Sequence, residues 1–545
     1  MIFHPSACSI LLLLLHGGHP HPTRGQPADS TRYLKHEKVD SPAPSSYPPT
    51  TDRPSLPIPS YSPTQSFKVA DLIAPSPDCA PIGSRSSPSS DEKPMPTDAD
   101  DDDDNKRYPP PSISVTKAPS NRPRSNGDPT DVTFREDPPT EVTFLRGDLR
   151  KDIKRLGIKV SKGITVRVIA NAGRFVNFAN GAKSSLPFHS SPDGAAVFPL
   201  TSGGYVYVSN SEVEGKRGGV YGVYFNDAGK VVNYKMLLSG TTRNCSGGST
   251  PWRTYVSCEE YGSGQCYQVD PDPESVHHLH PEKTVLGGKG GNYEAVACDN
   301  RDPSRPIFFL TEDAEFGALR RFTPLDISIT PKAGDLPGWD TLHTPGGTTD
   351  YLLFLADGYF TWTCDENAAR KSQSLYYPNT EGIVFWENSL YFVSKRTFKM
   401  YKLDLDKMTY TSSSTNKGMV GDGEFLHQPD QIVRNRGSGE NSSTPWLYFT
   451  EDGGKTVGVY AVNTKTGTKY SIFEAYGEKY FGDETTGLAF SPDGSKMYAC
   501  FQDCGCDTSG DSDCGCLLEL TRDDGMSFDG ETMALKFHKL KDGVE

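Results

Sequence analysis

Tyr205-Val-Tyr-Val-Ser209 is a run of aromatic and β-branched residues that ends in a small hydroxyl residue. Runs of this composition favour β-strands. The pattern occurs six times along the chain, with a thiol residue in place of the hydroxyl residue in the last run, and four of the six runs continue into carboxylates. The other five runs are Thr254-Tyr-Val-Ser257, Ile307-Phe-Phe-Leu-Thr311, Leu390-Tyr-Phe-Val-Ser394, Leu447-Tyr-Phe-Thr450 and Lys496-Met-Tyr-Ala-Cys500. The repetition predicts an all-β protein with many turns.

The small residues that end these runs are nearly evenly spaced. They stand at positions 209, 257, 311, 394, 450 and 500, so the intervals are 48, 54, 83, 56 and 50 residues. A second apolar run precedes each of them. A period near fifty residues with several strands per repeat is typical of a β-propeller, and six repeats predict six blades. The longest interval is expected to hold an insertion within 323–377, with a hidden seventh blade as the alternative.

The folded part of the chain is expected to span residues 138–545. Residues 23–137 are rich in Pro, Ser, Asp and Thr and contain hardly any apolar run. Such a segment cannot bury enough apolar surface to offset the entropy of ordering it, so we predict a disordered segment. Residues 1–22 form a candidate signal peptide around the apolar run Ile10–Leu15. A helix is expected over Leu149–Leu156.

Cysteine content and hydropathy bear on the compartment. The chain has 12 cysteines, which fit an oxidising environment, and we expect a secreted protein in an extracellular or periplasmic-like compartment. No stretch approaches eighteen apolar residues, so no transmembrane segment is expected. Cys504-Gly-Cys506 and Cys514-Gly-Cys516 predict two disulfides in a polar loop, with a zinc site as the alternative.

Charge and repeat position together indicate bound cations. The net charge of −14 argues against nucleic-acid binding, because a protein with excess negative charge does not attract a phosphate backbone. Carboxylates begin the apolar run that precedes the aromatic strand in four repeats, at Glu294, Glu381, Asp430 and Glu484. A propeller brings matching repeat positions together around one axis. A ring of carboxylates there would repel unless a cation lay among them, so the sequence predicts a metal site.

The densest motif is Asn244-Cys245-Ser-Gly-Gly248, followed by Thr250-Pro-Trp252 and Cys258-Glu-Glu260. It resembles the signature of the PhoX-type alkaline phosphatases, in which Asn-Cys-Ala-Gly-Gly precedes Thr-Pro-Trp-Gly-Thr-Trp and Cys-Glu-Glu. The resemblance covers about 188–502 and departs from the family at Tyr293, where His is usual, and at Arg253, where Gly is usual. It extends to Ser191-Pro-Asp-Gly194, Tyr207-Val-Ser-Asn210-Ser-Glu212, Asn292-Tyr293-Glu294-Ala-Val-Ala, Phe309-Leu-Thr-Glu312-Asp313, Glu381-Gly382, Gln428-Pro-Asp430 and Phe490-Ser-Pro-Asp-Gly494.

The resemblance implies a six-bladed propeller whose axial cleft holds iron and calcium ions and hydrolyses phosphomonoesters. Carried over by motif, Cys245 is the thiolate ligand of iron, and Glu294 and Glu381 are bridging carboxylates. Asn244 is expected to contact phosphate, which makes Asn244 and Cys245 the candidate catalytic residues. Calcium is assigned to the remaining candidates, Asp430, Glu451 and Glu484. The residue types suit these ions, because thiolates hold transition metals and carboxylates hold Ca²⁺.

The expected function is therefore a secreted, metal-dependent phosphomonoesterase that acts as a monomer on a small phosphomonoester. Two other classes stay open. One is a calcium-stabilised propeller that binds a glycan, peptide or matrix partner without catalysis, and the other is a lactonase-like hydrolase that does not need the Asn-Cys motif. For Cys245 the alternative role is a buried or disulfide-bonded cysteine. For Glu294 and Glu381 it is hydrogen bonding between blades.

Overall fold

The computed structural model describes residues 151–153, 156–161, 163–325, 338–415, 427–435, 445–454, 456–467, 469–475, 477–503 and 515–528. The expectations for residues 1–22 and 23–137 lie outside this part. Three of the four cysteines of the expected disulfide loop also lie outside it, whereas Cys516 is disulfide-bonded. None of the helices in the described ranges has the length and apolar character needed to cross a bilayer.

All six aromatic runs form strands, as the sequence predicts. They are β7 (Tyr205–Ser211), β11 (Tyr255–Tyr261), β15 (Ile307–Glu312), β20 (Ser389–Ser394), β24 (Trp446–Asp452) and β28 (Lys496–Phe501). Each pairs antiparallel with the strand formed by the preceding run. These first strands are β6 (Pro192–Pro199), β10 (Asn244–Ser249), β14 (Gly291–Asp299), β19 (Thr380–Trp386), β23 (Gln428–Val433) and β27 (Thr485–Phe490).

Further strands extend each sheet outward. They are β8 (Gly218–Phe225), β9 (Val231–Thr241), β12 (Cys266–Val269), β13 (Glu282–Lys283), β16 (Arg320–Thr323), β21 (Lys399–Asp404), β22 (Thr409–Ser414), β25 (Val457–Asn463), β26 (Lys469–Ala475) and β29 (Cys516–Arg522). The early strand β3 (Ile164–Asn171) pairs with β29, so the N-terminal side of the fold completes the last sheet. Strands β4 (Phe175–Asn177) and β5 (Lys183–Pro187) form a separate two-stranded ribbon.

The expected helix over Leu149–Leu156 is wrong in its described part. Lys151–Ile153 forms strand β1, which pairs with β2 (Ile158–Val160), and β2 in turn pairs with the edge of β26. The free sheet edge provides hydrogen-bond partners for an extended backbone, and this tertiary pairing overrides the local helical preference.

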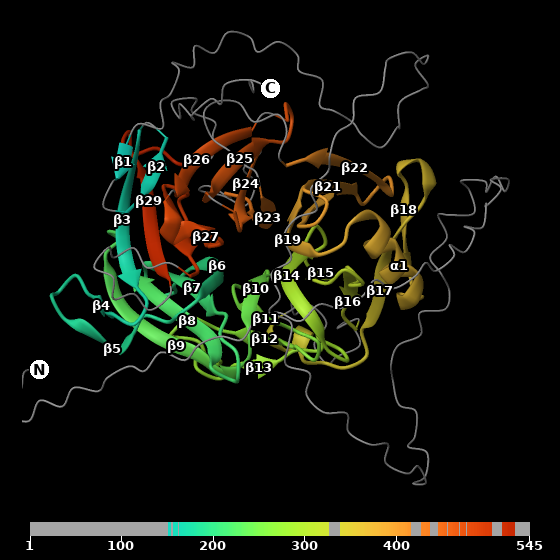
Figure 1. Cartoon of the computed structure of the whole chain (residues 1–545). Coiled ribbons are helices and arrows are strands. Elements are labelled where there is room, and N and C mark those ends of the chain that lie inside the picture. The colour runs from blue at the N-terminus through green and yellow to red at the C-terminus, as the bar shows by residue number, and fades with distance from the viewer. Residues whose placement is uncertain are drawn as a thin grey trace, which may run out of the picture. The chain divides into compact units, whose positions relative to one another are not determined.

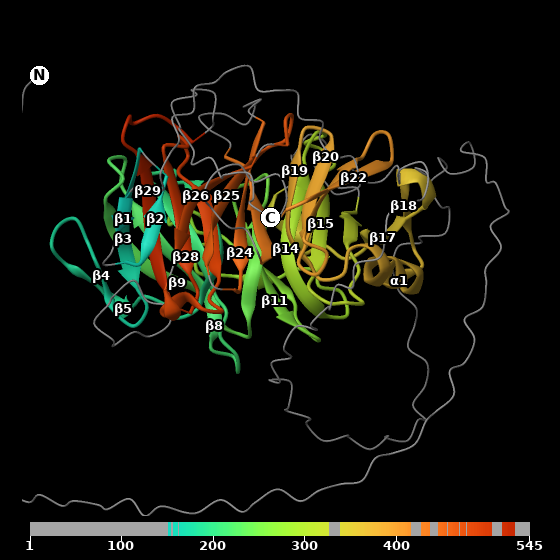
Figure 2. The same cartoon turned by 45° about the horizontal axis from the view of Figure 1, so that its top comes forward.

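The insertion expected within 323–377 does lie in that interval. It contains β17 (Thr348–Phe354), β18 (Phe360–Thr363) and helix α1 (Glu366–Tyr376). Short 3₁₀ helices span Trp339–Leu342 and Ala356–Gly358 there, and a third spans Glu478–Tyr480. Strands β17 and β18 continue the sheet of β14–β16, so the described part of this interval does not make a sheet of its own. Helix α1 lies beside β17 at the outer edge (Figures 1 and 2).

The first strands meet at a common centre. In the described part, β6, β10, β14, β19, β23 and β27 each contact the next, and β27 contacts β6 (Figure 1). The architecture is therefore all-β and propeller-like, as predicted. The blade count of six stays a prediction, because β11 also pairs with β14 and joins two successive groups of strands into one nine-stranded sheet.

Aromatic side chains hold neighbouring sheets together. Tyr207 of β7 and Tyr498 of β28 are both fully buried, with ring centroids 5.2 Å apart. The hydroxyls of Tyr205 and Tyr498 are hydrogen-bonded at 2.7 Å. Burying an aromatic side chain of this size contributes about 1.5–3 kcal/mol, so the contact between the first and last sheets is a strong one.

Two glycines of the Asn-Cys motif allow β10 to approach its neighbours closely. A Cβ on Gly248 would lie 1.9 Å from the carbonyl oxygen of Val296 on β14, and one on Gly247 would lie 2.0 Å from that of Val256. Carbonyl oxygens in paired strands cannot move aside without breaking the sheet. The two glycines therefore set the position of Cys245 relative to β11 and β14.

Gly248→Ala is accordingly expected to destabilise the protein by about 1–3 kcal/mol, the usual cost of overpacking. Urea unfolding followed by circular dichroism measures this change. Gly262→Ala is the matched control, because nothing lies within 4 Å of the added carbon, and its effect should stay within about 0.5 kcal/mol. Equal effects of the two substitutions would contradict the close approach of β10 and β14.

Candidate metal centre

A recurring β-bulge positions the chemical groups at the centre of the fold. Near the start of each first strand, two residues stand opposite one residue of the next strand. Such bulges bend the strand and redirect a side chain. We call the first residue of each pair a bulge residue; in chain order they are Asp193, Cys245, Glu294, Glu381, Asp430 and Gly487. Five of these six equivalent positions thus carry a carboxylate or a thiol.

A second set of equivalent positions lies next to the first. In each repeat, the residue just before the bulge pairs with a residue of the next strand. The residue that follows this partner belongs to the second set, and we call it a rim residue. The rim residues are Glu212, Glu260, Asp313, Lys395 and Asp452, with Phe501 at the sixth position. Their charged side chains are 12–26% exposed, whereas the five ligating bulge residues are buried. The centre therefore has a buried interior and a partly solvent-exposed rim.

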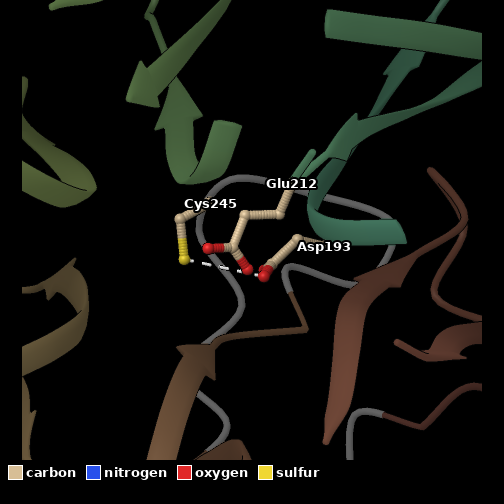
Figure 3. A group of neighbouring side chains, drawn as sticks. All are labelled: Asp193, Glu212 and Cys245. Carbon is tan, nitrogen blue, oxygen red and sulfur yellow. Dashed lines mark hydrogen bonds between the residues drawn. The ribbon is translucent and has the colours of Figure 1, made fainter. Parts of the chain in front are cut away.

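Bulge and rim residues combine around Cys245. The ligating atoms of Asp193, Glu212 and Cys245 all lie within 4.8 Å of one another. The Cys245 thiol donates a hydrogen bond to Asp193 Oδ2 over 3.5 Å. Figure 3 shows the three side chains pointing toward one another from β6, β10 and the end of β7. One thiol and two carboxylates from two successive repeats thus converge on one point.

Three more groups of the same kind continue from this one. Each contains three ligating atoms within 4.8 Å of one another, and each shares a residue with the group before it. They are Cys245 with Glu260 and Glu294, then Glu294 with Glu381 and Asp430, and then Asp430 with Asp452 and Glu484. The four groups form a continuous chain of eight carboxylates and one thiol across the centre.

Some of the buried oxygens in these groups have no hydrogen-bond partner. Both carboxylate oxygens of the fully buried Glu294 and Oδ1 of Asp430 have none among the described residues. Leaving a buried carboxylate without a partner is costly, and proteins generally avoid it. Carboxylate oxygens and a thiolate are also the donor types that Ca²⁺ and transition metals take. The residues present therefore fit bound cations.

Burial and mutual repulsion oppose ionisation of the centre when no cation is bound. Burial, followed by the charges of Asp430 and Asp193, raises the pKa of Glu294 well above its usual range. Burial and the nearby Asp193 likewise raise the pKa of the Cys245 thiol. Burial and the charges of Glu212 and Asp313 raise the pKa of Glu260 to about 8. A cation would reverse these shifts by favouring the ionised forms.

The structure brings most of the sequence candidates together. Cys245, Glu294, Glu381 and Asp430 are bulge residues, and Glu484 joins Asp430 in the last group. The prediction that Glu484 shares the repeat position of the other three acids is wrong. Gly487 holds that position in β27, and Glu484 lies three residues earlier.

Two candidates have protein partners of their own. The Glu451 carboxylate accepts hydrogen bonds from the His427 amide at 2.9 Å and the Tyr460 hydroxyl at 2.8 Å, and it lies outside the four groups. The Asn244 side chain donates to Ser257 at 2.9 Å, and its oxygen accepts from Thr241. A calcium role for Glu451 and a phosphate contact for Asn244 stay predictions.

Sequence reasoning passed over Asp193, and it could not separate Glu212, Glu260 and Asp452 from carboxylates that cap turns at strand ends. Asp193 lies in Ser191-Pro-Asp-Gly194, which has the composition of an ordinary turn. Its place becomes visible when the six repeats are aligned on their bulges rather than on the aromatic strands.

The structure shows the surroundings of the two residues that depart from the family pattern. The Tyr293 hydroxyl donates to the Gly287 carbonyl over 2.5 Å, and its ring lies 4.8 Å from the Arg320 guanidinium. Arg253 is exposed in the turn between β10 and β11, at the opposite end of the hairpin from Asn244. Neither side chain is a carboxylate, thiol or imidazole, so neither adds a ligand of these types to the four groups.

Fold and site together define an all-β, propeller-like protein with a buried centre of carboxylates and one thiol that can hold metal ions. The family described as alkaline phosphatase PhoX matches residues 227–336, which include the Asn-Cys motif and Glu294. The resemblance expected from the sequence is confirmed.

A solved structure supports the fold. Pseudomonas fluorescens PhoX in complex with vanadate, a transition state analogue, is 15% identical and covers 69% of this chain and 97% of its own, with a TM-score of 0.50. A gluconolactonase from Xanthomonas campestris, XC5397, is also 15% identical and covers 68% of this chain and 91% of its own, but its TM-score of 0.34 is too low to support an argument. No curated protein matches the chain.

The raised pKa values predict how stability depends on pH in the metal-free protein. A carboxyl with a raised folded-state pKa contributes stability below its ordinary pKa near 4.5, and this is lost as pH rises through the raised value. Thermal unfolding in chelator should therefore show falling stability between about pH 5 and pH 8. Each such group contributes up to about 1.4 kcal/mol per pH unit.

Glu294→Gln should reduce this loss, because the neutral amide removes one of the repelling charges. Added calcium should reduce it in the unmodified protein. Glu274→Gln, at an exposed position, is the control and should follow the unmodified protein. Parallel pH curves for Glu294→Gln and the control would show that the pKa of Glu294 is not raised in the folded state.

Proposed function

We propose that the chain is a metal-dependent phosphomonoesterase of PhoX type that binds iron and calcium. The observation that carries the proposal is the position of Cys245, whose thiol belongs to two adjoining carboxylate groups. A structural cysteine needs no such surroundings, and carboxylates that bind calcium alone need no thiol. The mixed donor set supports a transition metal next to calcium.

The two kinds of ion would divide the centre between them. Cys245, with Asp193, Glu212, Glu260 and Glu294 around it, would hold iron. The hard oxygen donors farther along the chain of groups would hold calcium, and these are Glu381, Asp430, Asp452 and Glu484. When bound, such cations neutralise the charge of a phosphoryl group and stabilise the leaving oxygen.

The residues of the centre explain why substrate binding would depend on the bound ions and from which side a substrate would reach them. Eight carboxylates near one point repel a phosphate dianion unless their charge is compensated, so substrate binding requires the loaded centre. Access lies on the rim side, where Glu212, Glu260 and Asp452 are partly exposed. Arg243, itself 37% exposed, orients two of these carboxylates through ion pairs of 3.3 and 3.0 Å.

The expected substrate is a small phosphomonoester. We also propose that the protein is secreted and acts as a monomer. The apolar run Ile10–Leu15 and the 12 cysteines support the secretory assignment. The disulfide-bonded Cys364 and Cys516 agree with an oxidising compartment.

The activity is tested with p-nitrophenyl phosphate after metal analysis of the purified protein. Iron and calcium together with turnover, and loss of turnover in chelator, are the expected results. Calcium alone without turnover would instead favour the non-catalytic calcium-stabilised propeller.

Cys245→Ala should remove iron and lower turnover by at least about 100-fold, because a transition metal cannot be held equally well by oxygen donors alone. Iron content by mass spectrometry and turnover are measured on the same sample. Cys298→Ala, at a half-buried position toward the other end of β14 from Glu294, is the control and should retain both. Full activity of the Cys245 variant would rule out the proposed mechanism.

A further inference from the structure

Lys395 is the one cation among the charged rim residues of the described repeats. Its backbone position matches theirs. The amide N–H groups of Glu212, Glu260, Asp313 and Lys395 each donate to the carbonyl two residues before the bulge residue of their own repeat. These carbonyls belong to Ser191, Arg243, Asn292 and Asn379. The fold therefore puts a lysine where three other repeats put a carboxylate in the same backbone setting.

The ammonium group of Lys395 contacts three carboxylates at once. Its Nζ lies 2.8 Å from Glu381, the bulge residue of its own repeat. It also lies 3.3 Å from Asp313 and 3.1 Å from Asp452, the rim residues of the preceding and following repeats. Lys395 thus forms ion pairs with the rim residues on both sides of it and with one buried bulge residue.

These contacts link two of the candidate metal groups. Glu381 belongs to the group with Glu294 and Asp430, and Asp452 belongs to the group with Asp430 and Glu484. The side-chain amide of Asn379 donates a hydrogen bond to the Asp313 carboxylate at 2.7 Å and holds this third partner of Lys395 in place. Three carboxylates thus surround one ammonium group at 2.8, 3.1 and 3.3 Å.

We propose that Lys395 is a built-in cation of this centre, whose ammonium takes the place of a divalent ion among Asp313, Glu381 and Asp452. The side chain thereby limits the number of ions that the centre binds, because it fills a position that a further calcium ion would otherwise take. This inference rests on the proposed metal-dependent function. A covalently attached charge has the further consequence that this position is filled at every calcium concentration.

The test counts calcium ions in Lys395→Met. Methionine has similar length but no charge, so the three carboxylates are left together without a cation. The full chain is equilibrated with calcium after treatment with chelator, and calcium per chain is measured by mass spectrometry. Lys395→Met is expected to bind one calcium ion more than the unmodified protein, and Lys395→Arg is expected to bind the same number as the unmodified protein.

Lys407→Met is the matched control, because Lys407 forms a 2.7 Å ion pair with Asp404 but is 72% exposed on the surface. It should leave the calcium count unchanged. An unchanged or lower count in Lys395→Met would overturn the inference. If that variant unfolds in chelator, calcium should restore its circular dichroism spectrum, and failure to do so would also overturn the inference.

The result is separable from the proposed function. Absence of metal or of turnover in the unmodified protein would count against the phosphomonoesterase, whatever the variant does. A metal-loaded, active protein whose Lys395→Met variant gains no calcium would refute only the role of Lys395.

Discussion

The arrangement of the centre depends on one backbone feature, the β-bulge near the start of each first strand. In a regular strand, side chains alternate between the two faces of a sheet. The bulge changes this alternation at one residue, and six repeats place the affected residues around the same centre. Close contact between neighbouring first strands requires small residues beside the bulge: a Cβ on Gly194 would lie 2.4 Å from Ser246, and one on Gly382 would lie 2.4 Å from the Ile432 amide nitrogen. Packing and site geometry therefore have the same cause.

Concentrating carboxylates in this way is unfavourable for the fold alone. Burial and like charge raise the pKa values of Glu294 and Glu381, so the apo centre either takes up protons or loses stability. Part of the charge is balanced internally. Arg243 pairs with Glu212 and Glu260, and Gln431 and Gln502 donate to Asp193, each at 2.7 Å. The buried oxygens of Glu294 have no such compensation among the described residues, and they mark where cations are most needed.

The sequence was sufficient to predict the strands and half of the centre. Aromatic and β-branched runs recur with a period, and Cys245, Glu294, Glu381 and Asp430 lie at positions that the motifs identify. The register of the bulge is not visible in the spacing, because an extra residue in one strand changes no composition. For that reason Asp193 resembled a turn residue, and Glu484 was aligned three residues away from its true equivalent, Gly487. Lys395 escaped notice because a search for a ring of acids passes over the one position with the opposite charge.

The positions of the positively charged side chains explain why the charge of the centre is distributed asymmetrically although the fold repeats. Arg243 and Lys395 compensate the rim at two separate places, through Glu212 and Glu260 on one side and Asp313 and Asp452 on the other. At the sixth repeat the equivalent positions hold Gly487 and Phe501, neither of which carries a charge. The remaining uncompensated groups run from Cys245 through Glu294 to Asp430, so repulsion is strongest in the buried interior and weakest at the rim. The interior groups are therefore the ones that would hold ions, and the partly exposed rim is the side of the centre that solvent reaches.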